Sequence, residues 1–121
     1  MENYMPADDK RRYRRVGTNL AVQYRDLKKT AELPKGSVLR NISEGGACFV
    51  SKEFMSLACR LIVNITLPDN PKPVKAISKV AWIRRLPSGD QYELGNQFLE
   101  IAKEDKVLIS DFVKSTMASD R

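Results

Sequence analysis

The segment Arg60–Leu67, RLIVNITL, has the most regular alternation of apolar and polar side chains in the sequence. Leucine, valine, isoleucine and leucine occupy positions 61, 63, 65 and 67, whereas positions 60, 64 and 66 are polar. Successive side chains of a β-strand point to opposite faces, so this period of two predicts a strand that is buried on one face. Residues 68–71, Pro-Asp-Asn-Pro, predict a turn directly after it.

Five further segments have the composition or alternation of strands, and turn-forming residues separate them. Residues 44–46, Glu-Gly-Gly, predict a tight reversal, and residues 87–90, Pro-Ser-Gly-Asp, predict a hairpin loop. A polar stretch, residues 26–36, separates the first two of these strands. The five segments are Asn19–Arg25, Val38–Ser43, Ala47–Ser51, Val74–Ile83 and Gln91–Ile101.

The hydrophobic period becomes helical after Lys103. The apolar positions are then Leu108, Ile109, Phe112, Val113 and Met117. Glu104 and Asp105 occupy the first turn, where the helix dipole favours negative charge. Short antiparallel strands bury their edges best when the sheet closes, and one amphipathic helix can cover a mouth or flank of the barrel. We therefore predict a mainly β fold, a six-stranded antiparallel β-barrel with a C-terminal α-helix.

The length of 121 residues and the 42% hydrophobic content suit one domain with one core. We expect a flexible leader at residues 1–9, a single domain at residues 10–118 that includes a basic arm at residues 10–16, and a tail at residues 119–121. No stretch approaches the roughly 18 to 20 apolar residues of a membrane span, and the N-terminus is polar rather than signal-like. We therefore expect a soluble, cytoplasmic protein without membrane insertion.

The residue types exclude several kinds of active site. The sequence contains no histidine, which excludes histidine-activated nucleophiles and argues strongly against zinc. The two cysteines, Cys48 and Cys59, lie in apolar surroundings, which favours free buried thiols over a disulfide. Carboxylates such as Asp90 and Glu93 show no paired, pocket-like arrangement. We therefore expect no catalytic residues, no metal and no cofactor.

The positive charge is concentrated in the arm. Of the formal net charge of +6, five charges come from Lys10, Arg11, Arg12, Arg14 and Arg15, so the rest of the chain has a net charge of +1. A protein that grips a long phosphate backbone usually spreads its basic residues over a face. The clustering therefore favours a compact anionic ligand over a long nucleic acid.

Two short motifs lie on either side of the first predicted strand. Residues 11–15 read Arg-Arg-Tyr-Arg-Arg, and residues 41–46 read Asn-Ile-Ser-Glu-Gly-Gly. Together they resemble the PilZ domain family, which has an Arg-x-x-x-Arg pair near its N-terminus and an Asp/Asn-x-Ser-x-x-Gly motif in the hairpin after its first strands. Residues 80–84, Val-Ala-Trp-Ile-Arg, and residues 94–98, Leu-Gly-Asn-Gln-Phe, are also similar. The resemblance covers about residues 10–118 and implies a PilZ-type β-barrel.

The resemblance also implies a ligand, the bacterial second messenger cyclic di-GMP, which has two phosphates and two guanines. The residues that match the family motifs, and are therefore the implied ligand contacts, are Arg11, Arg15, Asn41, Ser43 and Gly46. The arginine fork matches a phosphate and also the O6 and N7 acceptors of guanine. Asn41 and Ser43 alternate onto one side of their strand. A solvated basic tail and an ordinary turn remain the structural alternatives.

Five further residues are weaker candidates for the same site: Lys10, Arg12, Gly45, Trp82 and Arg84. Glycine at positions 45 and 46 keeps the surface open and permits positive φ or close backbone approach. An aromatic at the Trp82 position can line the ligand surface in relatives, and a core role fits it equally well. Tyr13 could stack on a base or anchor the arm. In the family, the residue type at the position of Lys10 is associated with whether one ligand or a stacked pair of ligands is bound.

The resemblance, together with the clustered charge, therefore implies a small stand-alone cyclic di-GMP receptor that catalyses no reaction and signals to an unidentified protein partner. Only Gly17 and Thr18 separate the arm from the barrel, so we expect the arm to swing and fold over the ligand. One alternative is a binder of single-stranded nucleic acid, which the 7% aromatic content disfavours because such proteins need exposed stacking platforms. Another alternative is a PilZ-like protein-interaction adaptor without a ligand, and the surviving motifs argue against it.

Overall fold

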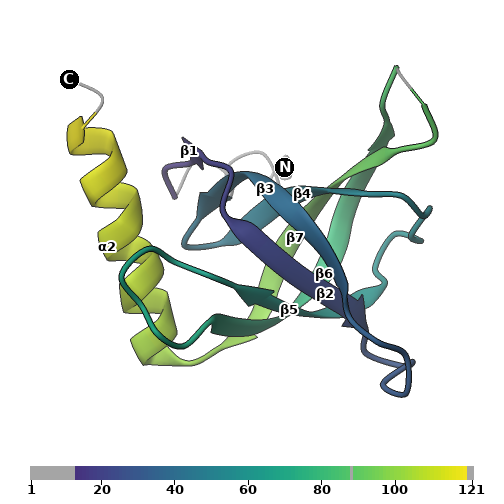
Figure 1. Cartoon of the computed structure of the whole chain (residues 1–121), viewed down its shortest axis with the longest axis horizontal. Helices are drawn as coiled ribbons and strands as arrows, with labels where there is room; N and C mark the ends of the chain where they lie inside the picture. Colours follow the sequence, from purple (N-terminus) through teal and green to yellow (C-terminus); the bar gives the residue numbers. More distant parts are fainter. Residues whose placement is uncertain (1–12, 88, 120–121) are drawn as a thin grey trace, which may run out of the picture.

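A computed structural model of the chain describes residues 13–87 and 89–119. This part of the chain forms seven strands and one helix (Figure 1). The strands are β1 (Val16–Gly17), β2 (Ala21–Asp26), β3 (Lys35–Ser43), β4 (Gly46–Ser51), β5 (Arg60–Ile65), β6 (Val74–Arg85) and β7 (Tyr92–Ile101), and the helix is α2 (Lys103–Ser119). All six predicted strands and the predicted helix are present, with ends that differ by a few residues.

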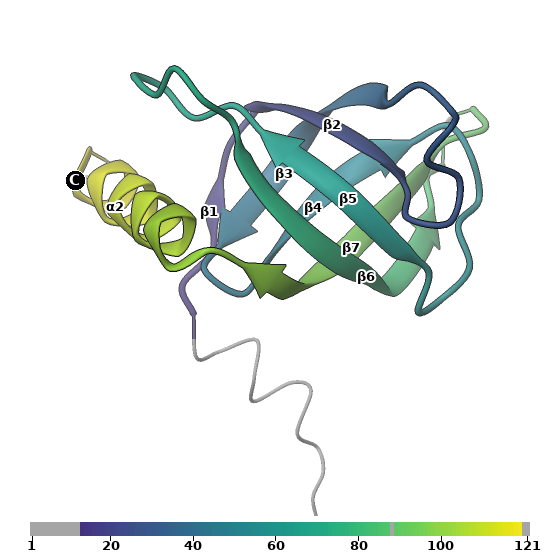
Figure 2. The same cartoon turned by 90° about the horizontal axis from the view of Figure 1, so that it is seen from below.

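Six of the strands close into an antiparallel barrel. Their order is β3, β2, β5, β6, β7 and β4, and a further pairing between β4 and β3 completes the ring (Figure 2). The predicted fold class, a six-stranded antiparallel barrel with a C-terminal helix, is thus confirmed. The pairing of β3 with β1 adds a short outer strand that the sequence pattern did not predict.

The outer strand β1 extends the line of β2 along one edge of β3. Val16 and Gly17 pair with Ile42 and Asn41, and the Thr18 N–H donates to a carbonyl of β3 at 3.1 Å. Val16 is only 6% exposed, so its side chain belongs to the core. The expectation that Gly17 and Thr18 form a swinging link is therefore wrong, because ladder hydrogen bonds and the burial of Val16 hold this segment against β3.

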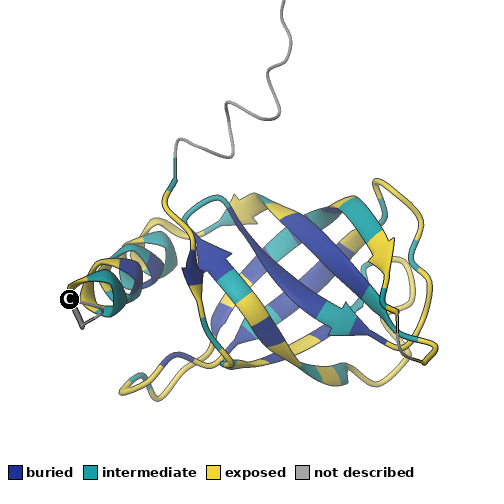
Figure 3. Cartoon of the chain, turned by 90° about the horizontal axis from the view of Figure 1, so that it is seen from above, coloured by how far each residue is buried: buried dark blue, intermediate teal, exposed yellow. Residues whose placement is uncertain are grey.

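The hydrophobic core fills the barrel (Figure 3). Buried positions alternate with more exposed ones along β2 and most of β6, whereas β4, β5 and β7 contain runs of buried residues. In β5, Leu61, Val63 and Ile65 are at most 1% exposed, as their alternation predicts. α2 packs on β1, β3 and β6 and contributes Ile109 and Val113 to the core. Because it packs on β1, the helix lies beside the segment that carries the arm.

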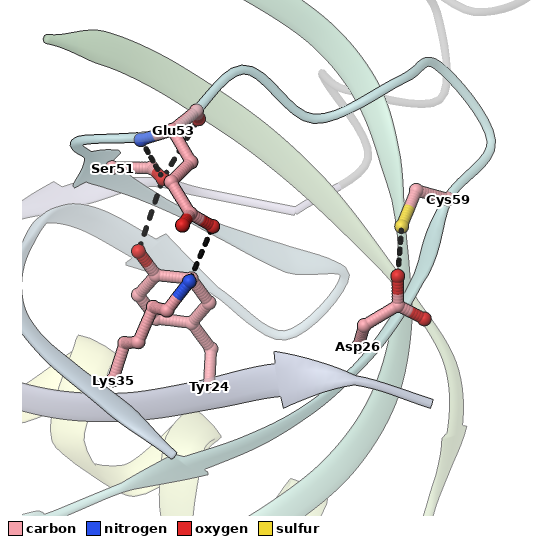
Figure 4. A network of polar contacts seen from close by, with 6 residues as sticks. All are labelled: Tyr24, Asp26, Lys35, Ser51, Glu53 and Cys59. Atoms are coloured by element: carbon pink, nitrogen blue, oxygen red, sulfur yellow. Dashed lines mark hydrogen bonds and ion pairs between the residues drawn. The ribbon is translucent and has the colours of Figure 1, made fainter. Parts of the chain in front are cut away.

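A polar cluster joins β2, β3 and the segment after β4 (Figure 4). The buried Tyr24 hydroxyl donates to Ser51 Oγ at 3.0 Å, and Ser51 Oγ donates to the Glu53 carbonyl oxygen at 2.9 Å. Lys35 forms an ion pair with the Glu53 carboxylate. These contacts satisfy the buried hydroxyl of the tyrosine, which would otherwise weaken the core.

Both cysteines are free thiols, as the sequence indicates. Cys59 Sγ lies 3.7 Å from Asp26 Oδ2 (Figure 4). Burial, and next the Asp26 carboxylate, raise the pKa of the Cys59 thiol. Burial, and next the Glu93 carboxylate, raise the pKa of Cys48 to about 12. Both shifts favour the protonated thiol, which is a weaker nucleophile than the thiolate.

Candidate ligand-binding groove

The outer face of the barrel brings together residues from β3, β4, β7 and β6. The pairing register places Asn41 opposite Cys48, Cys48 opposite Gly95, and Gly95 opposite Trp82. The first three share the outer face because their chain neighbours, such as the fully buried Ile42, point into the core. A row of residues that are far apart in the sequence thus crosses four adjacent strands.

An open groove of about 730 Å³ lies on this side of the molecule. Its walls come from the arm, the β3–β4 hairpin, β6, β7 and the first turn of α2. Of the residues proposed from the sequence, the groove is lined by Arg15, Ser43, Gly45, Gly46 and Trp82. The two motifs, which are separated in the sequence by β2, therefore meet at one groove.

Ser43 shapes the turn between β3 and β4. Its Oγ accepts a hydrogen bond from the Gly45 N–H at 3.1 Å and donates to the Gly46 carbonyl oxygen at 3.5 Å, and the residue is 4% exposed. A serine hydroxyl in this position replaces a backbone partner of the turn. The Phe98 N–H also donates to the Gly45 carbonyl oxygen at 2.9 Å. The hairpin is therefore held in one shape and fastened to β7.

Gly45 and Gly46 are required for space, because neither has a positive φ. A Cβ on Gly46 would lie 2.0 Å from the carbonyl oxygen of Asn96, and a Cβ on Gly45 would lie 2.8 Å from the ring of Tyr13. Of the two reasons considered for these glycines, close approach applies and positive φ does not. Gly46 lets β4 lie close to β7, and Gly45 lets the tyrosine ring lie on the hairpin.

Tyr13 connects the arm, the hairpin and the helix. Its ring lies against Gly45, and Lys106 Nζ of α2 lies 5.3 Å from the ring centroid. This separation is within the range of a cation–π interaction. The two roles considered for Tyr13 were stacking on a base and anchoring the arm, and these contacts are those of an anchor.

Lys103 and Lys106 also line the groove, and sequence reasoning did not identify them. Residues three apart lie on one side of a helix, so both ammonium groups can reach the same groove. Together with Arg15 they place three basic side chains in the lining, against the two acidic residues Glu44 and Glu100. Their spacing was the only signal in the sequence, and it could not show which side of α2 faces the groove.

Arg84 and Asn41 lie near the groove but do not line it. Arg84 Nη2 is 2.6 Å from Glu93 Oε1, and Arg40 Nε is 3.2 Å from Glu93 Oε2. The Glu93 side chain is 11% exposed, so the two arginines hold a largely buried carboxylate. Arg84 is therefore engaged in an ion pair, while Asn41 is half-buried and pairs through its backbone with β1 and β4.

The remaining proposed residues, Lys10, Arg11 and Arg12, lie outside the described residues, so their part in the site stays a prediction. Across residues 13–87 and 89–119, no group of three or more histidine, cysteine, aspartate or glutamate residues could hold a metal ion. The helix found in this part of the chain is neither long nor apolar enough to span a membrane.

Comparison with solved structures shows which proteins share this fold. The Bacillus subtilis inhibitor of motility, MotI/DgrA, matches with a TM-score of 0.78 and 21% identity over 90% of this chain and 52% of its own. The PilZ domain of YcgR from Escherichia coli, with c-di-GMP, matches with a TM-score of 0.70 and 14% identity over 93% and 95%. The K. pneumonia MrkH-c-di-GMP complex matches with a TM-score of 0.72 and 16% identity over 90% and 52%. The chain thus spans about half the length of the first and third proteins.

Sequence comparison assigns the family. No curated protein matches the chain in a search of their sequences. The family model of the PilZ domain matches residues 9–115, from the basic arm through the barrel and into α2. The match covers most of the chain and agrees with the closed barrel, so this protein belongs to the PilZ domain family.

Proposed function

We propose that this protein is a receptor for cyclic di-GMP, and that the ligand binds in the groove on the outer face of the barrel. One observation carries the proposal. Arg15 from the first motif and Ser43 to Gly46 from the second line the same groove, beside the half-buried Trp82. Similar barrels from YcgR and MrkH have been solved with c-di-GMP, which supports the same ligand here.

The groove residues suit the chemistry of this ligand. Arg15 offers a planar fork of donors that matches a phosphate or the O6 and N7 edge of guanine. Lys103 and Lys106 add positive charge for the two phosphates. Trp82 supplies an aromatic face for a base. The protein's role in this proposal is binding alone, with no reaction at the site.

We further propose that the ligand orders the arm over the groove and that a protein partner reads the resulting surface. Val16 and Gly17 are held against β3, so the chain leaves the barrel at Tyr13 to Arg15, directly beside the groove. In this proposal, the arginines upstream of this point contact the bound dinucleotide while the barrel itself stays unchanged. Ligand phosphates would neutralise the mutual repulsion of the five clustered basic residues.

Hydrogen exchange provides a test of this ordering. At saturating cyclic di-GMP, the exchange of the amides of residues 10–15 is expected to slow by about tenfold or more, because the ligand must dissociate before these amides can open to solvent. Amides of β5 and β6 outside the groove serve as the internal control and should change little. Equal protection of the arm with and without ligand would contradict the switch and leave a rigid receptor.

Ligand identity can be tested by calorimetric titration of the full chain. Cyclic di-GMP is expected to bind at least about tenfold more tightly than cyclic di-AMP, because adenine presents a donor amine where guanine presents O6, and a mismatched edge costs about 1 to 3 kcal/mol. Similar affinities would contradict recognition of guanine. A short single-stranded DNA that binds more tightly than either would favour the nucleic-acid alternative, and no binding of any of the three would favour an adaptor without ligand.

A further inference from the structure

Trp82 rests on Gly95, and this contact is closer than any residue with a side chain would allow. A Cβ built on Gly95 would lie 2.1 Å from Cε2, 2.1 Å from Nε1 and 2.7 Å from Cδ1 of the indole. Similar short distances to three ring atoms place this point over the face of the ring rather than beyond its edge. Gly95 has no positive φ, so the position requires glycine for space and not for backbone conformation.

An irregularity in β6 brings the indole to this position. Val80 pairs with Asn96 and Trp82 pairs with Gly95, so Ala81 is an extra residue on β6. Val80 is 1% exposed and points into the core, and a regular strand would point Trp82 inward as well. A bulge shifts the alternation by one residue, so it turns Trp82 to the outer face.

We propose that Gly95 is a positioning residue that seats the Trp82 indole flat on β7, so that its other face forms the floor on which one guanine of the ligand stacks. This inference rests on the proposed function. The indole is half-buried and lines the groove together with Arg15 and the hairpin. A flat, supported ring is a good stacking partner because a base can cover it without first fixing its rotamer.

The only tryptophan in the chain is Trp82, so its fluorescence reports directly on this site. Gly95→Ala is expected to displace the indole, shift its emission to the red through added solvent contact, and weaken cyclic di-GMP binding about tenfold. Trp82→Ala is expected to weaken binding by a similar factor. In the Trp82→Ala background, Gly95→Ala should cause no further loss, because the added methyl group then meets no indole.

The double variant distinguishes an effect of Gly95 that acts through the Trp82 indole from a direct effect of Gly95 on the ligand. If Gly95→Ala weakens binding as much without the indole as with it, or leaves binding and emission unchanged, the assignment to Gly95 is overturned. Gly36→Ala is the matched control, since a Cβ there would have no neighbour within 4 Å. Should Gly95→Ala fail to fold, the double variant is expected to fold again, and its failure to do so would also overturn the inference.

Failure of the proposed function gives a different result. If the unaltered protein does not bind cyclic di-GMP, the stacking role is overturned together with the receptor role. The emission shift in Gly95→Ala would nevertheless still be expected, because it depends only on the contact between Gly95 and the indole. The two failures are thus distinguished by affinity and fluorescence measured on the same variants.

Discussion

Replacement of Arg15 by alanine is expected to weaken cyclic di-GMP binding by about 2 to 4 kcal/mol, or roughly 30- to 700-fold in Kd. The physical reason is the loss of a charge-assisted, forked contact, which leaves a ligand phosphate or guanine edge without its partner. The same loss is expected for Arg11, the other arginine of the motif. Calorimetric titration of each variant measures the effect.

Arg14 provides the matched control. It carries the same charge on the same arm and is exposed, but it does not line the groove. Arg14→Ala should therefore change the affinity only a few-fold, through general charge attraction that salt screens. The thermal unfolding of Arg15→Ala should remain close to that of the unaltered protein, because Arg15 is exposed. Equal losses for Arg14 and Arg15 would show that the arm acts only as a diffuse charge.

Replacement of Gly46 by alanine is expected to lower the free energy of unfolding by about 3 kcal/mol, with a fall in Tm on the order of 10 °C. The added Cβ would lie 2.0 Å from the carbonyl oxygen of Asn96 and 3.3 Å from Cα of Gln97. Both contacts are with backbone, so β4 and β7 must separate locally rather than move a side chain aside. Gly46→Val should be worse, and should also distort the hairpin wall of the groove.

Denaturant unfolding measures the loss of stability in Gly46→Ala, and Gly36→Ala, which adds the same methyl group at another glycine, is the control. Gly36 is also in a strand, but an added Cβ meets open space there, so its substitution should be neutral or stabilise by up to about 1 kcal/mol. If the two substitutions had the same effect, the tight approach of β4 to β7 at Gly46 would be refuted. A full loss of binding by well-folded Gly46→Ala would instead place the glycine in direct contact with the ligand.

Local pattern alone was sufficient for the six barrel strands and the helix, but not for the outer strand β1. The alternation of Leu61, Val63 and Ile65 predicted the buried face of β5, and the helical spacing of Ile109 and Val113 predicted the face of α2 that joins the core. The spacing of hydrophobic residues shows which side chains share a face, because the backbone geometry of a strand or helix repeats at a fixed interval along the chain. The two motifs were also specific enough to indicate the family, and three of their residues, Arg15, Ser43 and Gly46, line the candidate groove.

The sequence was less informative about Trp82, Gly46, Arg84 and the lysines of α2. The direction of Trp82 depends on a bulge that arises only when β6 pairs with β7. The need for Gly46 depends on the approach of a backbone that is distant in sequence, and Arg84 is held by Glu93 from the next strand. These partners lie on other strands, so a local sequence pattern could not identify them.

By itself, the sequence determined six of the seven described strands, the helix and the two motifs that mark this chain as a PilZ domain. Periodicity and turn chemistry act between near neighbours in the chain, which is why a local pattern was enough for these features. Only the tertiary structure decided which residues form the groove. Strand register, one bulge and the packing direction of α2 bring Tyr13, Gly95, Lys103 and Lys106 to the motif residues. These arrangements depend on contacts between distant segments, which form only when the barrel closes and the helix docks.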